Sequence, residues 1–85
     1  MQTQRKSMIR RLILEQLSAA YPCGCSQNIL NAGLQTAGVN LSADELIEEL
    51  AYLTSKGHAT TKRDKLSTAN VFYFITAQGL EILDS

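Results

Sequence analysis

The sequence predicts an α+β fold, in which three helices precede a β-hairpin and a short final helix. Apolar residues recur every three or four positions between Gln4 and Leu53, a spacing typical of helices with one buried face. After Gly57 the pattern changes to β-branched and aromatic residues, which are typical of strands. At 85 residues, the chain is expected to form a single domain, 1–85.

The first helix is expected from Gln4 to Ala20. Its apolar face consists of Met8, Ile9, Leu12, Ile13, Leu17 and Ala20. The helix must end before Pro22, because a proline moves the preceding residue out of the helical region. We expect the segment 23–25 to be a connector.

Two shorter helices follow, and each starts with a capping signal. Ser26 is a favourable N-cap for the second helix, which should end at Gly38. Ser42 and Glu45 form a capping-box pattern that starts the third helix, which should end at Gly57. The expected apolar faces are Ile29, Leu30, Leu34 and Ala37 on the second helix, and Leu46, Ile47, Leu50 and Leu53 on the third.

The strands of the hairpin are expected at 59–61 and 70–76, joined by a polar, mobile tip. By the period of two, Phe72 and Phe74 share one face, which we expect to be the core, and Tyr73 takes the other. Thr76 can cap the final helix. Leu80 would pack on the core although Gly79 costs the helix about 1 kcal/mol.

The composition and the absence of known motifs argue against a membrane protein, an enzyme and a zinc protein. No apolar run approaches the roughly 20 residues that cross a bilayer, so we expect a cytoplasmic protein without a membrane partner. There is no paired acid–base arrangement, phosphate-cradling glycine loop or metal-ligand set, so neither an enzyme nor a cofactor is expected. Cys23 and Cys25 with His58 supply at most three soft ligands, fewer than structural zinc requires.

The net charge is zero, but the charges are sorted into blocks. Residues 5–11 carry only positive charges, residues 44–49 carry only negative charges, and the hairpin tip is basic. A surface of this kind suits a partner protein or self-association as well as DNA.

Two segments resemble the winged-helix family, in which a hairpin called the wing follows a helix-turn-helix. These segments are LIEELAYLTSKGHATTKR and VFYFITAQGLEIL, and they are similar to small MarR-like and PadR-like transcriptional regulators of bacteria or phages. The resemblance implies a transcription regulator whose third helix lies in the major groove of double-stranded DNA. Basic wing residues and the start of the second helix would contact phosphates. The residues expected to bind DNA are Ser26, Gln27, Asn28, Lys56, Lys62, Arg63 and Lys65.

The third helix leaves an alternative open. Its outward residues would include Asp44, Glu45, Glu48, Glu49 and Tyr52. Four carboxylates would be repelled by the phosphates of a duplex. The alternative is therefore a winged-helix interaction module that binds a basic protein partner through this acidic face, without DNA. A regulator of palindromic sites would be a homodimer, formed through the first or the last helix.

Overall fold

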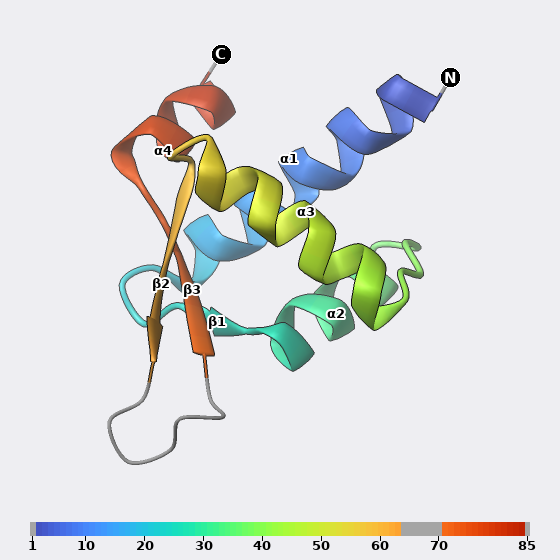
Figure 1. The fold of residues 1–85 in the computed structure, drawn as a ribbon, viewed down its shortest axis with the longest axis horizontal. Coiled ribbons are helices and arrows are strands. Elements are labelled where there is room, and N and C mark those ends of the chain that lie inside the picture. Colours follow the sequence, from blue (N-terminus) through green and yellow to red (C-terminus); the bar gives the residue numbers. More distant parts are fainter. Residues whose placement is uncertain (1, 64–70, 85) are drawn as a thin grey trace.

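The computed structural model describes residues 2–63 and 71–84. These ranges contain α1 (Gln2–Ala20), β1 (Cys25–Ser26), α2 (Gln27–Thr36), α3 (Ala43–Ser55), β2 (Ala59–Arg63), β3 (Val71–Ile75) and α4 (Ala77–Asp84). The predicted α+β class and the order of three helices, hairpin and final helix are confirmed (Figure 1). Among the described residues, no helix has the length and apolar character needed to cross a membrane.

The helix boundaries follow local signals in the sequence. The Ser26 hydroxyl accepts a hydrogen bond from the Ile29 amide at the start of α2. Ser42 and Glu45 form the predicted capping box, with both hydrogen bonds at 3.1 Å. Gly57 follows α3 with a φ of 78°, a left-handed conformation that glycine adopts without steric cost.

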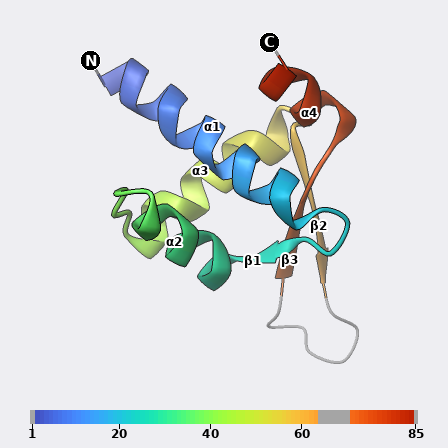
Figure 2. The ribbon, with the colours of Figure 1, turned by 180° about the vertical axis from the view of Figure 1, so that it is seen from behind.

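The sheet contains a strand that was not predicted. The order β1-β3-β2 is antiparallel, with β1 formed by two residues from the expected connector. The preceding Gly24 has a φ of 77°, and a Cβ atom there would lie 2.6 Å from the Phe74 ring. Glycine therefore lets the connector lie directly on β3. Figure 2 shows β1 leading from the sheet into α2.

The predicted hairpin pairing is confirmed, since β2 and β3 pair from Ala59 opposite Ile75 to Arg63 opposite Val71. Strand β2 extends two residues beyond the predicted segment 59–61. The mobile tip was expected at 62–68, but Lys62 and Arg63 belong to β2. The rest of that segment lies outside the described residues.

The core lies between the helices and the inner face of the sheet. Its largest fully buried side chains are Ile13, Leu14, Leu17, Leu30, Leu34, Leu46, Leu50 and Leu53. Five apolar residues predicted to be inward are instead exposed, namely Met8, Ile29, Ala37, Ile47 and Leu80. Neighbouring helical positions point about 100° apart, so with Leu30 and Leu46 buried, Ile29 and Ile47 turn to solvent.

The predicted orientation of β3 is wrong. Tyr73 packs against the core on the same face as buried Ile75, whereas Phe72 and Phe74 lie half-buried on the other face. The alternation was predicted correctly, but an aromatic pair alone does not determine which face is inward. The buried end of the strand, at Ile75, determines it.

Helix α4 is attached to the rest of the fold at both ends. Thr76 accepts a hydrogen bond from the Gly79 amide and donates one to the Gly57 carbonyl at 2.6 Å. A Cβ atom at Gly79 would overlap the His58 carbonyl, so glycine is required at this close contact. At the other end, the Arg11 guanidinium donates to two carbonyls of α4, at 3.0 and 3.4 Å.

Candidate nucleic-acid interface

One position of the sheet brings the start of α2 beside the wing. Phe72 of β3 pairs with Ser26 of β1 on one side and with Lys62 of β2 on the other. Adjacent strands lie about 4.8 Å apart, so the backbones of Ser26 and Lys62 are separated by about 10 Å. The sheet therefore brings together two groups that the sequence predicts to bind DNA.

The start of α2 has the properties of an anion-binding helix end. Gln27 and Asn28 form its first turn, where backbone amides have no acceptor within the helix. These amides and the helix dipole favour a negatively charged group such as a phosphate. Ser26 occupies the N-cap, and Asn28 is exposed.

The other residues predicted to bind DNA do not all lie beside the start of α2. Lys62 is exposed on β2, with its Nζ atom 5.8 Å from the centre of the Phe74 ring. Arg63 follows it at the end of the strand, and Lys65 lies outside the described residues. Lys56 ends α3 at the opposite end of β2, so the fold separates it from this cluster (Figure 1).

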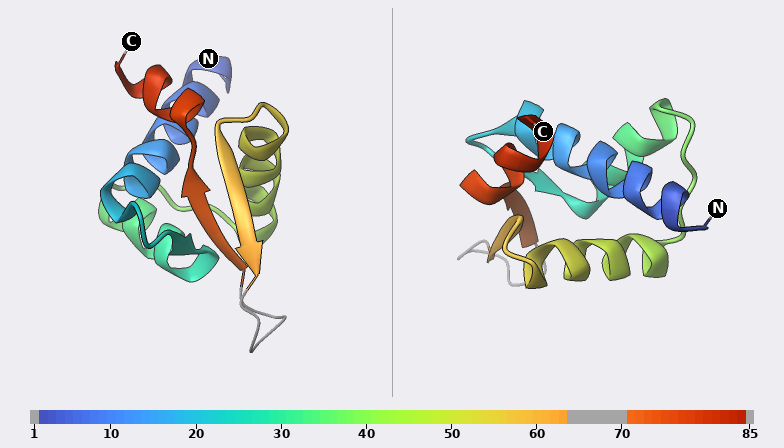
Figure 3. Two further views of the ribbon diagram at one scale, coloured as in Figure 1. Left: turned by 90° about the vertical axis from the view of Figure 1, so that its left-hand side faces the viewer. Right: turned by 90° about the horizontal axis from the view of Figure 1, so that it is seen from above.

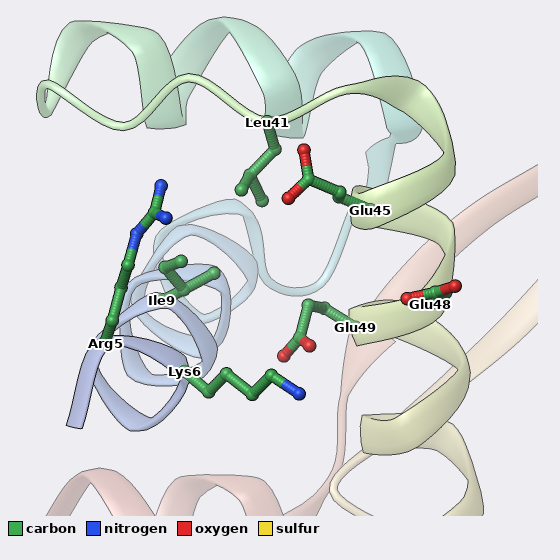
Figure 4. A pocket seen from close by; sticks show the side chains of 7 residues that line it. All are labelled: Arg5, Lys6, Ile9, Leu41, Glu45, Glu48 and Glu49. Atoms are coloured by element: carbon green, nitrogen blue, oxygen red, sulfur yellow. The ribbon is translucent and has the colours of Figure 1, made fainter. Parts of the chain in front are cut away.

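The acidic residues of α3 face two directions. Figure 4 shows Glu45 and Glu49 on the side of α3 that faces α1, with Lys6 extended toward Glu49. Asp44 and Glu48 are exposed. The expected face of four outward carboxylates is therefore wrong for Glu49, whose side chain is only 13% exposed.

Residues of α1 compensate the acids that face it. The Arg10 Nε atom donates to the Glu49 carboxylate at 2.6 Å, and its guanidinium carbon lies 3.6 Å from the centre of the Tyr52 ring. Hydrogen bonds from Ser42 lower the pKa of Glu45, and the charge of Arg5 lowers it further.

A hollow of about 270 Å³ lies between α1 and α3, with charges of both signs around an apolar floor. It is lined by Arg5, Lys6, Ile9, Leu41, Glu45, Glu48 and Glu49 (Figure 4).

The described residues contain no group of three His, Cys, Asp or Glu side chains that could hold a metal ion. Cys23 is exposed and Cys25 is buried, and burial raises the pKa of the Cys25 thiol.

The contact between Arg10 and Glu49 was not predicted from the sequence. They are 39 residues apart, so no local pattern connects them. The opposite charges of the blocks 5–11 and 44–49 were a signal that the two helices could face each other.

Solved structures of transcription regulators share this fold. A PadR-like transcription factor from Bacteroides fragilis matches with a TM-score of 0.82 over 98% of this chain and 80% of its own, at 19% identity. S. aureus MepR, solved as a complex with DNA, matches with a TM-score of 0.77 over 98% of this chain and 71% of its own, at 17% identity. The chain spans about half the length of other MepR structures that it resembles, at 51%.

These neighbours are winged-helix regulators of the MarR and PadR families, and this chain has their winged helix-turn-helix fold. In that fold, α2 and α3 form the helix-turn-helix, and β2 and β3 form the wing. No protein-family model matches the sequence, and a comparison with curated proteins finds no match.

Proposed function

We propose that this protein binds double-stranded DNA and regulates transcription in a bacterium or phage. The fold is shared with transcription regulators, one of which was solved in complex with DNA. The observation that carries the proposal is the pairing of both Ser26 and Lys62 with Phe72. This pairing puts the amide-rich start of α2 and a wing cation close enough to contact neighbouring phosphates.

In this proposal, phosphate contacts position the protein on the duplex. Lys62, Arg63 and Lys65 supply cations, and the segment 26–28 supplies amides and short polar side chains. Helix α3 lies near the major groove. Its exposed carboxylates Asp44 and Glu48 form no ion pair with α1 among the described residues. An acid in the groove can accept a hydrogen bond from a cytosine amino group.

The protein would act at a promoter, either by occluding it or by recruitment. This action would need no catalytic step and no cofactor. Residues 1–85 would work as one winged-helix domain in the cytoplasm. A palindromic site would require a homodimer, because half-sites about 34 Å apart match a two-fold axis.

Amide chemical-shift mapping of the protein with a short duplex tests this proposal. We expect the largest shift changes at 26–28 and 60–63, with smaller changes along the exposed side of α3. A single-stranded oligonucleotide of equal length is the control for charge alone. Shift changes confined to α1 and α4, or none at 50 mM salt, would contradict the proposal.

A further inference from the structure

Arg10 connects α1 to the helix that the proposed function directs at DNA. Its guanidinium pairs with Glu49 at 2.6 Å and covers the ring of Tyr52 at 3.6 Å. Both partners lie on α3, one helical turn apart, and their side chains face α1. Seen from above, α1 and α3 lie in separate layers (Figure 3), and the Arg10 side chain spans them.

We propose that Arg10 is a positioning residue that holds the Glu49 and Tyr52 side chains against α1 and so determines which side chains of α3 face DNA. This inference rests on the proposed function. An ion pair to Glu49 and a stacked contact with Tyr52 hold two positions of α3 at once. A planar guanidinium makes both contacts, whereas an ammonium group lacks the flat stacking surface.

The burial of Glu49 explains why this contact matters. Its side chain is 13% exposed and that of Arg10 is 25% exposed, and among the described residues Arg10 is the cation that forms an ion pair with Glu49. Without Arg10, the Glu49 carboxylate is favoured only where water solvates it, which moves its side chain away from α1 and toward the exposed surface of α3. Glu49 would then join Glu48 on the exposed surface and repel the phosphates.

For Glu49, this inference predicts a change in DNA affinity opposite to the change that the loss of a negative charge alone would cause. Removing a negative charge from a DNA-binding protein normally strengthens its affinity for DNA. Glu48→Gln should do this, because Glu48 is exposed and has no ion pair among the described residues. Glu49→Gln removes the same charge but loses the pairing with Arg10, so it should weaken binding about threefold.

A second variant removes the contact without changing the net charge. Arg10→Lys keeps the positive charge but loses the flat stack on Tyr52, so its affinity for DNA should fall about threefold. The matched control is Arg11→Lys on the same helix. Arg11 is exposed, donates to carbonyls of α4 and forms no hydrogen bond or ion pair with α3 among the described residues, so this control should keep wild-type affinity within about 1.5-fold.

The experiment is fluorescence anisotropy of a labelled generic duplex with the wild-type chain, residues 1–85, and the four variants. Circular dichroism first identifies a temperature at which all five proteins are folded. The inference is overturned if Glu49→Gln binds as tightly as Glu48→Gln, or if Arg10→Lys binds as wild type does. Failure of wild type itself to bind would instead contradict the proposed function, so the two failures are distinguishable.

Discussion

Ser26 and Lys62 pair with the same residue, Phe72, from opposite sides of β3. One residue starts the helix-turn-helix and the other belongs to the wing, although 36 positions separate them in the sequence. The short strand β1 is therefore the element that joins the two proposed phosphate contacts. The rigidity of the sheet sets the distance between them.

Replacing Lys62 by alanine should reduce both the affinity for DNA and its dependence on salt. Each lost phosphate contact lowers the slope of log affinity against log salt concentration by about 1. Anisotropy titrations at several salt concentrations measure this slope. The control is Arg11→Ala, which removes the same charge from α1 and should leave the slope nearly unchanged. Equal slopes for wild type and Lys62→Ala would exclude a phosphate contact by this lysine.

The ionised Glu45 side chain should contribute to the free energy of unfolding at neutral pH, and this contribution should be lost at acidic pH. Its pKa is lowered in the folded protein from an ordinary value of 4.5, chiefly by hydrogen bonds with Ser42. A lowered folded-state pKa gives a stabilisation that is present above about pH 4.5 and is lost as the pH falls through the folded-state pKa. Glu45→Gln should therefore be less stable than wild type at pH 7, and this difference should shrink at pH 3. Urea unfolding at both values provides the test, which a constant difference would fail.

Two glycines inside helices should respond oppositely to alanine. Gly79→Ala would push a methyl group into the His58 carbonyl and should lower the free energy of unfolding by about 2 kcal/mol. At Gly33 the added methyl meets only the movable end of the Gln16 side chain, so Gly33→Ala should raise the free energy of unfolding by up to about 1 kcal/mol. Chemical denaturation of both variants measures these values. A Gly79→Ala variant as stable as wild type would contradict the described docking of α4.

The two cysteines should differ in reactivity. Cys23 is exposed, whereas Cys25 is 3% exposed and burial raises its pKa, which lowers the fraction of reactive thiolate. A native-state thiol assay should show rapid modification of Cys23 and protection of Cys25 until the protein unfolds. Cys23→Ala should abolish the rapid phase. Rapid modification of Cys25 in that variant would mean that β1 separates readily from β3.

The helices and their ends were predictable because their causes are local. Ser42 and Glu45 are three residues apart, and the capping box they form needs no other part of the chain. The strand β1 was missed because two residues show no periodicity. The inward face of β3 was predicted incorrectly because the core, rather than the alternation of its side chains, determines it.

The residues of the candidate site could be predicted from the sequence, but their arrangement in space could not. Lys62 and the start of α2 were identified from residue types, and pairing through β3 brings them together. Lys56 was included because it is near in sequence, yet α3 carries it to the other end of β2. The compensation of Glu49 by Arg10 depends on tertiary packing across 39 residues. Binding of DNA or of a basic protein by any of these residues stays a prediction.

The proposed interface is tested most directly by the affinity of the wild-type protein for generic duplex DNA, measured between about 50 and 200 mM salt. About three phosphate contacts, from the wing and the start of α2, predict a log–log slope near −3. Binding with this slope would support the proposed interface. Absence of binding at 50 mM salt, or binding that does not change with salt, would contradict the claim that the wing and α2 hold DNA phosphates.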